Sequence, residues 1–495
     1  MEHLACAAGN SGQRRRGAAG LRVSRRECLA GLLPTLLWPL RAASAPRAKP
    51  NILFIMIDTL RADHVGCYGY GKPTTPSIDR LAREGVRFPS LYTAGPWTMP
   101  SVMTMFTSLY PTVHGATGYQ HRASLKVTTL AEHLKRLGYR RTVGIVSNPT
   151  VNSRYGFAQG FDRYDDYSIF FAHELNLFEL DDVPQRKSVV EAVTSHTVTR
   201  MATDWLAKEG RRGPWFLFLL YFDPHTDYVP PQPWDRRFDP HPHAENRKAK
   251  PNVRHLLGKD TTPSDLEHIL ALYDGEIGYT DRCVGELLTR LDRLGLRDNT
   301  VVLLTSDHGE EFLDHGGILH GRTLYDELMR GILILRHPDR LPAGKVAPAR
   351  ACHLDIAPTL IECIGEKPDG ECQGVSQLRA ITGTESDGSS APDRPCYLEA
   401  TSTQDLRAVV VGRHKLVHDV QAGREELLDL ESDPKERTNV ASQKPHVCGR
   451  LRAMLTAHVS ECEGLARKYQ SHGTVVRPKL TRRDIQILRA LGYIQ

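Results

Sequence analysis

Three uninterrupted apolar runs, each followed by acidic or histidine side chains, constrain the fold of this chain more than any other feature of its sequence. The runs are residues 51–57, 215–221 and 301–305. An apolar run without polar positions is typical of a strand that is buried on both faces of a sheet. Because open α/β sheets place ligands at the carboxyl ends of their strands, we expect Asp58, Asp307 and His308 to meet at one edge.

Helical patterns alternate with these runs. We expect helices over residues 75–84, 128–137, 188–208 and 263–294, and a further strand over residues 141–146. Strands that alternate with helices predict an α/β fold in which a large sheet is sandwiched between helices. We assign this catalytic domain to residues 46–390.

The amino-acid composition changes before the C-terminal part of the chain. Residues 382–395 are rich in Gly, Ser, Asp and Pro, which is typical of a domain boundary. Beyond them, short strand patterns precede a long helical pattern over residues 443–469. This order predicts a smaller C-terminal α+β subdomain with a small antiparallel sheet, which we assign to residues 391–495.

A hydroxyl side chain lies where another helix is expected to begin. Thr98 stands just before Pro100 and Ser101, and a helical pattern continues over residues 102–109. Proline suits the first turn of a helix, and the free amides of that turn attract anions. Thr98 is therefore a candidate nucleophile, with an ordinary helix cap as the alternative interpretation.

Carboxylates and an imidazole at one sheet edge suit a divalent cation. Asp58, Asp307 and His308 would supply three ligands and the Thr98 oxygen a fourth. Coordination lowers the pKa of a hydroxyl and makes it a nucleophile near neutral pH. We expect one such cation, with Ca, Mg, Mn and Zn left open.

Three further side chains are candidates for binding the group that is transferred. His225 can donate to a non-bridging oxygen or protonate the leaving group. His320 and Arg322 lie close together in a second His-rich segment, and the planar guanidinium of Arg322 suits an oxyanion. A surface ion pair or a structural histidine is the alternative for each.

Together these segments resemble the sulfatase family of the alkaline phosphatase superfamily. The resemblance is carried, in the family's order, by residues 51–69 (NILFIMIDTLRADHVGCYG), 75–88, 107–115, 305–321 (TSDHGEEFLDHGGILHG), 324–334, 353–360, 412–416, 426–434 and 488–494. It implies a mixed sheet of the alkaline-phosphatase type and a metal-assisted ester hydrolase. The positions of Asp58, Thr98, Asp307 and His308 match those that hold the metal and the nucleophile, and Arg322 stands where sulfatases usually carry Lys.

Departures from the family pattern affect the chemistry. Sulfatases that use formylglycine carry Cys or Ser followed by Pro-Ser-Arg, whereas this chain has Thr98 and Val102. Threonine cannot be oxidised to that aldehyde, so no formylglycine is expected. Thr59 replaces a second Asp, and residues 146–149 replace a Gly-Lys-x-His segment. A threonine nucleophile resembles that of lipoteichoic-acid synthases and phosphoethanolamine transferases.

Nucleotide pyrophosphatases also use threonine but bind two metals. Asp223, His225 and His320 are the residues that could supply a second metal site here. The leading hypothesis remains a hydrolase of sulfuric, phosphoric or phosphonic esters, on small molecules or glycans, with Thr98 as covalent nucleophile. An exported transferase of phospho-alcohols onto glycan or lipid, and a non-catalytic family member, are the alternatives.

The first 45 residues predict a signal peptide of the twin-arginine type. Arg25 and Arg26 precede an apolar run over residues 29–40, and Ala-Ser-Ala at 43–45 suits cleavage. The run is too short to span a bilayer, so no stable membrane insertion is expected. The prediction is a periplasmic or secreted protein that meets the twin-arginine export machinery, with a disordered basic tail or uncleaved anchor as the alternative.

Charge and cysteine content exclude other classes. Nine basic and two acidic residues precede Pro50, so the net charge of +6 leaves the rest of the chain near −1 and gives no argument for a nucleic-acid partner. The ten cysteines show no zinc spacing. A bridge between Cys363 and Cys372 is possible, whereas Cys448 and Cys462 would be separated along one helix.

Overall fold

The computed structural model describes residues 49–166, 194–240, 258, 260–368, 370–383, 394–401, 404–469, 477–482, 484, 485 and 488. The predicted signal peptide, most of the predicted domain boundary and nearly all of the last resembling segment lie outside the described residues.

One eight-stranded sheet forms the centre of the fold, with strand order β12-β2-β11-β7-β1-β6-β4-β5. Its strands are β1 (Asn51–Ile57), β2 (Val86–Arg87), β4 (Arg141–Val146), β5 (Arg163–Asp165), β6 (Trp215–Tyr221), β7 (Thr300–Ser306), β11 (Leu333–Arg336) and β12 (Lys345–Val346). The strands from β7 to β5 run parallel, whereas β11 is antiparallel to β7 and to β2. The predicted mixed sheet is confirmed.

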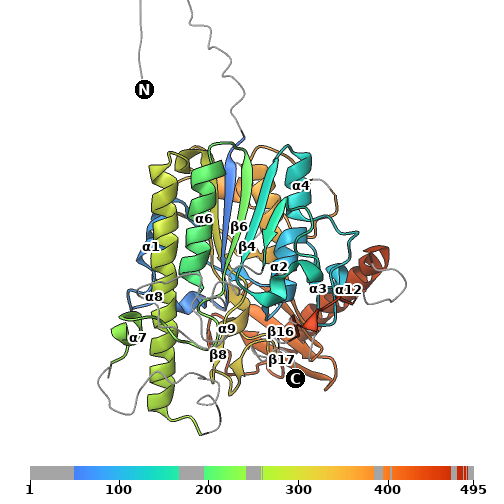
Figure 1. The fold of residues 1–495 in the computed structure, drawn as a ribbon. Helices are drawn as coiled ribbons and strands as arrows, with labels where there is room; N and C mark the ends of the chain where they lie inside the picture. Colours follow the sequence, from blue (N-terminus) through green and yellow to red (C-terminus); the bar gives the residue numbers. More distant parts are fainter. Residues whose placement is uncertain are drawn as a thin grey trace, which may run out of the picture. The chain divides into compact units, whose positions relative to one another are not determined.

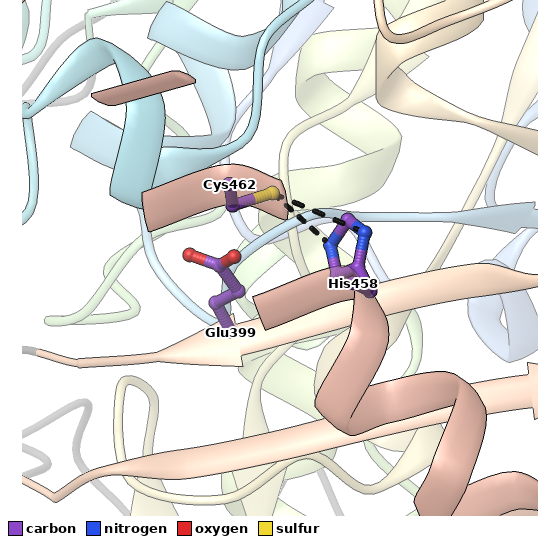
Figure 2. A group of neighbouring side chains, drawn as sticks. All are labelled: Glu399, His458 and Cys462. Atoms are coloured by element: carbon purple, nitrogen blue, oxygen red, sulfur yellow. Dashed lines mark hydrogen bonds between the residues drawn. The ribbon is translucent and has the colours of Figure 1, made fainter. Parts of the chain in front are cut away.

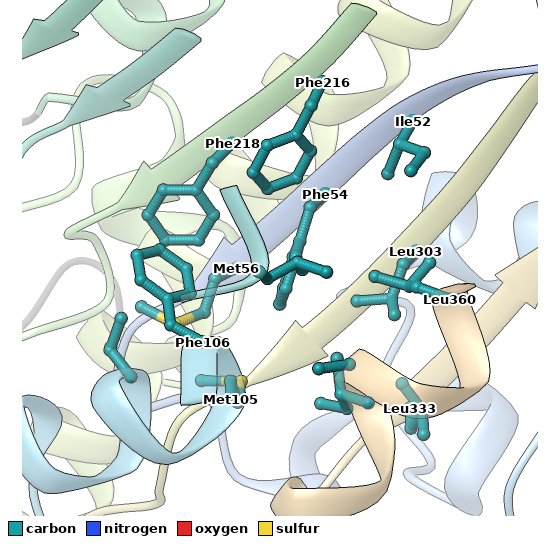
Figure 3. Packing of buried hydrophobic residues seen from close by; sticks show 14 of the residues in the cluster. Ile52, Phe54, Met56, Met105, Phe106, Phe216, Phe218, Leu303, Leu333 and Leu360 are labelled. Atoms are coloured by element: carbon teal, nitrogen blue, oxygen red, sulfur yellow. The ribbon is translucent and has the colours of Figure 1, made fainter. Parts of the chain in front are cut away.

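Helices cover both faces of the sheet (Figure 1), and alternate side chains of the buried strands pack against these two layers. Helices α2 (Thr98–Thr107), α4 (Leu130–Arg136) and α10 (Ile356–Cys363) cover one face, and α1 (Pro76–Glu84), α6 (Ser195–Glu209) and α8 (Pro263–Arg293) cover the other. Figure 3 shows the first face, where Phe54 and Met56 of β1 pack with Phe218 and Phe106. The predicted sandwich is therefore confirmed, because β1 is buried from both sides.

A second, antiparallel sheet follows in the carboxyl-terminal part. It consists of β14 (Cys396–Ala400), β15 (Leu406–Val411), β16 (His414–Asp419) and β17 (Arg424–Asp429). Helix α12 (Pro445–Tyr469) packs on this sheet through Leu451 and Leu455, which lie in one apolar cluster with Leu416 and Leu427. The predicted α+β subdomain is confirmed, while its boundary near residue 390 lies outside the described residues.

Shorter elements connect these layers. They are β3 (Leu91–Tyr92), α3 (Pro111–His114), α7 (Trp234–Arg237), β8 (Glu311–Phe312), β9 (Ile318–Leu319), α9 (Asp326–Met329), β10 (Arg330–Gly331), β13 (Ala351–Cys352) and α11 (Leu378–Thr382). Among the described residues, no helix is long and apolar enough to cross a bilayer. The possible bridge between Cys363 and Cys372 is not formed, since both thiols are free.

Candidate active site

Four neighbouring parallel strands deliver their polar residues to one edge of the central sheet. Asp307 and His308 follow β7, Asp58 follows β1, His225 lies after β6, and Asn148 lies after β4. These strands are adjacent in the order β7-β1-β6-β4, so residues far apart in the chain converge. The sheet edge therefore builds the site without any contribution from the helix interiors.

Asp58, Asp307 and His308 form a fully buried group whose ligand atoms all lie within 4.8 Å of one another. The His308 Nε2 atom is 3.4 Å from Asp307 Oδ2 and 3.7 Å from Asp58 Oδ1. Both of these carboxylate oxygens lack a hydrogen-bond partner among the described residues. Because buried oxygens are normally satisfied, two such atoms facing one imidazole fit a divalent cation.

The protonation of this group also suits a cation. Burial raises the pKa of Asp58 well above its usual range, with the charge of Asp307 adding to the effect. Burial likewise raises the pKa of Asp307 to about 7. The carboxylates repel each other in a site of low polarity, and a positive ion between them removes that repulsion.

The imidazole of His308 is held as a neutral ligand. Its Nδ1 lies 2.8 Å from the carbonyl oxygen of Gly309, which can only accept, so Nδ1 carries the proton. The lone pair of Nε2 is thereby directed at the carboxylates. Burial lowers the pKa of His308 well below its usual range.

Thr98 lies beside this group and is 1 % exposed. Its Oγ1 is 3.3 Å from His308 Nε2. Helix α2 begins at Thr98 itself, with Trp97 as its cap, so it starts two residues before the Pro100–Ser101 start that the sequence predicts. Pro100 is tolerated at the third position because every amide of a first turn lacks a partner within the helix.

His320 is paired with a buried carboxylate. Its Nδ1 lies 2.9 Å from Glu310 Oε1, while Glu310 Oε2 accepts the hydroxyl of Tyr228 at 3.0 Å. The His320 ring is 4.5 Å from that of His308 and 5.0 Å from that of His225, measured between centroids. The sequence predicted His225 and His320 but missed this use of Glu310.

A family model for sulfatases matches residues 50–366, which is more than half of the chain. The chain belongs to the sulfatase family. It is accordingly a sulfatase-family ester hydrolase of the alkaline phosphatase superfamily. A second model, for the C-terminal part of N-sulphoglucosamine sulphohydrolase, matches residues 314–463.

Relatives in this family match most of the length of the chain. An arylsulfatase of Clostridium perfringens is 26 % identical over 80 % of the chain and 91 % of its own length. A multifunctional alkaline phosphatase superfamily protein, PehA, of Trinickia caryophylli is 26 % identical over 79 % of the chain and 91 % of its own length. The structure of a phosphonate monoester hydrolase of Agrobacterium radiobacter superposes with a TM-score of 0.66 at 22 % identity, covering 85 % and 96 % of the two chains.

Asn148 occupies the loop in which this chain departs from the family pattern. Its Nδ2 donates to Asp58 Oδ2 at 2.5 Å and to Thr98 Oγ1 at 3.4 Å. Its Oδ1 accepts from the amide and hydroxyl of Thr150, at 2.8 and 2.7 Å, which fixes the orientation of the amide group. The sequence pattern indicates only a loss of anion-binding groups in this segment and does not single out Asn148, although its place after β4 follows the same rule that located Asp58.

Thr59, Asp223 and Arg322, which the sequence analysis also considered, do not belong to the group of metal-type ligands. Thr59 adopts a left-handed backbone (φ 51°), and its amide donates to Asp307 Oδ1 at 3.1 Å. Asp223 accepts the amides of Thr194 and Ser195 at the start of α6, at 2.9 and 2.7 Å, so this carboxylate caps a helix and gives little support to a second metal. Arg322 is exposed, and its predicted role stays a prediction.

Replacing Asn148 by Ala is expected to lower kcat/KM about 10- to 100-fold, because Thr98 and Asp58 lose the donor that holds them. Steady-state kinetics at saturating metal would measure the loss. Asn152 is the matched control, since its side chain caps the next turn through Arg154 N (2.9 Å) and donates to Pro149 O (3.0 Å). Asn152→Ala should cost stability and leave kcat/KM nearly unchanged; equal losses in both variants would reduce Asn148 to a structural role.

Proposed function

We propose that this protein is a metal-dependent hydrolase of phosphoric, phosphonic or sulfuric esters and that Thr98 is its covalent nucleophile. The observation that carries the proposal is the 3.3 Å contact between Thr98 Oγ1 and His308 Nε2, beside two buried carboxylate oxygens without hydrogen-bond partners. A relative named as an arylsulfatase and a similar structure named as a phosphonate monoester hydrolase support sulfuric and phosphonic esters as substrates.

Asp58, Asp307, His308 and Thr98 would hold the cation. When bound, it supplies positive charge that lowers the pKa of a coordinated hydroxyl and attracts the non-bridging oxygens of an ester. The protein contributes by excluding bulk water from these ligands and by holding their side chains in place. The complete burial of Asp58, Asp307 and His308 serves both purposes.

The reaction proceeds in two displacements. The Thr98 hydroxyl loses its proton to solvent, Oγ1 forms a bond to phosphorus or sulfur, and the bond to the leaving alcohol breaks. The leaving oxygen takes a proton from an imidazolium. Water then attacks the same centre, the bond to Oγ1 breaks, and Thr98 regains its proton. Asn148 donates to Oγ1 and so keeps this atom aimed at the substrate.

The nucleophile favours phosphorus esters over sulfate esters. A formylglycine hydrate has a second hydroxyl and can release sulfate by breaking a carbon–oxygen bond, which spares an attack on sulfur. Threonine has one hydroxyl, so its ester must be hydrolysed at the central atom. That step is slow for a sulfate ester and easier for a phosphate ester. We therefore rank phosphate and phosphonate esters ahead of sulfate esters.

Turnover of three matched aryl esters, a sulfate, a phosphate diester and a phosphonate monoester, tests the proposal with protein loaded with Mn, Mg, Ca or Zn. We expect the phosphorus esters to be hydrolysed faster. Faster turnover of the sulfate would overturn the ranking, and metal-loaded protein inert toward all three would overturn the hydrolase proposal.

His320 is the better candidate for the proton donor. The Glu310 carboxylate lies at hydrogen-bonding distance from the Nδ1 of His320 and orients its ring, whereas the Nδ1 of His225 lies 3.0 Å from the carbonyl oxygen of Thr226. His320→Gln is expected to lower kcat about 100- to 1,000-fold for an alkyl leaving group and less than about 10-fold for 4-nitrophenol, which leaves without protonation.

The same pair of substrates provides the control. His225→Gln should lower the rate to a similar extent with both leaving groups, because this histidine would contact a non-bridging oxygen. A loss in His320→Gln that does not depend on the leaving group would assign the proton transfer elsewhere.

A further inference from the structure

Two buried tyrosines, Tyr228 and Tyr273, have hydroxyl groups that reach the surroundings of the candidate site. Both side chains are fully buried. Their rings meet edge to face with centroids 5.5 Å apart, and both contact the ring of Phe312, at 5.6 and 4.9 Å. Burial raises the pKa of each phenol well above its usual range, so both hydroxyls keep their protons and can donate. No step of the ester hydrolysis proposed above uses either hydroxyl.

Tyr228 holds one end of the Glu310 carboxylate. Its hydroxyl donates to Glu310 Oε2 at 3.0 Å, and the hydroxyl of Thr226 donates to the same oxygen at 3.3 Å. The other oxygen, Oε1, lies 2.9 Å from His320 Nδ1. Because a carboxylate that is bonded at both oxygens cannot turn freely, the Tyr228 hydroxyl helps to set the direction of the His320 ring.

Tyr273 holds the turn that follows β1. Its hydroxyl donates to the carbonyl oxygen of Thr59 at 2.7 Å and accepts from the amide of Arg61 at 2.9 Å. Thr59 has a left-handed backbone (φ 51°), which β-branched residues rarely adopt, so its conformation depends on contacts of this kind.

The turn in its place orients Asp307. The amides of Thr59 and His308 both donate to Asp307 Oδ1, at 3.1 and 2.8 Å. With Oδ1 held by two donors, Oδ2 is the oxygen that faces the imidazole of His308, 3.4 Å from its Nε2. The Tyr273 hydroxyl therefore acts on the direction of Asp307 through Thr59 alone.

We propose that Tyr228 and Tyr273 are positioning residues that serve two different parts of the candidate site. Tyr228 orients the proton donor His320 through the carboxylate that lies between them. Tyr273 orients the metal ligand Asp307 through the turn after β1. This inference rests on the proposed function, in which His320 protonates the leaving oxygen and Asp307 binds the cation.

A purely structural role in the core is the competing interpretation, and another polar cluster shows what such a role looks like. Glu399, His458 and Cys462 lie between β14 and α12 (Figure 2). Cys462 Sγ lies 3.5 Å from Nε2 and 3.9 Å from Nδ1 of His458, so it stands beside the ring edge, and burial raises the pKa of this thiol to about 12. Packing of the helix on the small sheet accounts for this cluster, whereas each tyrosine hydroxyl reaches the candidate site through one intermediate residue.

Phenylalanine variants of the full-length protein remove a hydroxyl and keep the ring. Tyr228→Phe is expected to lower kcat about 10-fold for an alkyl leaving group and less than about 3-fold for 4-nitrophenol, which leaves without protonation. The loss is smaller than that expected for His320→Gln, because the Thr226 hydroxyl still donates to Glu310. The affinity for Mn²⁺, measured by calorimetry on metal-free protein, should stay within about 3-fold of the wild type.

Tyr273→Phe should give the opposite pattern. We expect it to weaken Mn²⁺ binding about 10-fold or more, while at saturating metal any fall in kcat is the same for both leaving groups. Tyr221→Phe is the matched control, because this buried tyrosine ends β6 and its hydroxyl lies 2.9 Å from that of Thr199. It should lower stability and change neither the metal affinity nor the dependence on the leaving group.

A double variant separates failure of this inference from failure of the proposed function. In a His320→Gln background, Tyr228→Phe should cause no further loss of kcat for the alkyl leaving group, because the side chain that it orients is gone. If His320→Gln shows no dependence on the leaving group, the proton donor is wrongly assigned, and the role of Tyr228 falls with it. If His320→Gln shows the dependence and Tyr228→Phe does not, the role of Tyr228 alone is overturned.

Metal affinity is measured without turnover, so it tests Tyr273 even in protein that hydrolyses none of the esters. Mn²⁺ binding by Tyr273→Phe that equals wild-type binding would overturn the role of Tyr273. Equal changes in Tyr221→Phe and in both other variants would leave all three hydroxyls with a structural role only.

Discussion

Thr98→Ala is expected to abolish ester turnover, with a fall in kcat of about 10,000-fold or more, because the variant has no oxygen to form the covalent intermediate. Its content of metal should stay close to that of the wild type, since Asp58, Asp307 and His308 remain. Kinetics with the best aryl ester, together with metal analysis of the same sample, would measure both quantities. Thr98→Ser keeps the hydroxyl and should retain activity within about 10-fold.

Thr104 provides a matched control on the same helix. It is also fully buried, and its Oγ1 lies 3.1 Å from the Nε2 of His114, so it reproduces a threonine–histidine contact outside the metal group. Thr104→Ala should lower stability by about 1–3 kcal/mol and leave kcat nearly unchanged. Wild-type turnover in Thr98→Ala would remove the nucleophile assignment, whereas equal losses of activity in both variants would point to a defect of helix α2.

The central strands could be predicted from the sequence because their burial is a property of the strands themselves. The ends of β1 and β6 were placed at residues 51–57 and 215–221, where the structure has them, since an apolar run between polar residues leaves little freedom. The two-residue strands β2 and β12 were not predicted. They are defined only by their pairing with other strands at the sheet edge. Because those partner strands are distant in the sequence, the residues of β2 and β12 alone do not predict the pairing.

In the candidate site, too, the residues at strand ends could be predicted from the sequence, whereas those defined by contacts between loops could not. Asp58, Asp307 and His308 come together as the strand-edge argument expected, and Thr98 at the start of α2 lies beside them, while the chemical roles of all four remain proposals. Asn148 was missed because an amide after a strand has no motif of its own, and its importance lies in two contacts with other segments.

The pairing of Glu310 with His320 was missed for a similar reason. The contact depends on how the chain folds back between β8 and β9. Residue type and spacing can thus locate the ligands of a strand edge, whereas the groups that orient them emerge only from the packing of neighbouring loops.

Removal of the metal should make the stability of the protein depend on pH in a characteristic direction. In metal-free protein, burial raises the pKa of Asp307 from its ordinary 3.8 to about 7 and that of Asp58 well above its usual range. The folded state therefore binds more protons than the unfolded chain between these values, so stability falls as the pH rises from about 4 to about 7. The Asp307 shift alone corresponds to about 4 kcal/mol.

Urea unfolding at pH 5 and pH 8, with a chelator and with added metal, would measure this effect. Metal should stabilise the protein more at pH 8, where it replaces charge repulsion, than at pH 5, where protons already neutralise the carboxylates. Asp58→Asn removes one of the two charges. We expect this variant to be more stable than chelated wild type at pH 8, to gain little from metal and to lose activity about 1,000-fold.

Asp281 is the matched control for that experiment. This buried carboxylate of α8 also has a pKa raised by burial, to about 6, but it accepts the amides of Ser77 and Ile78 at the start of α1 and lies outside the metal group. Asp281→Asn should alter stability in every condition while the gain on adding metal stays that of the wild type. Chelated wild-type protein with equal stability at pH 5 and pH 8 would contradict the cation site, because two unneutralised carboxylates at 0 % exposure cannot be ionised without cost.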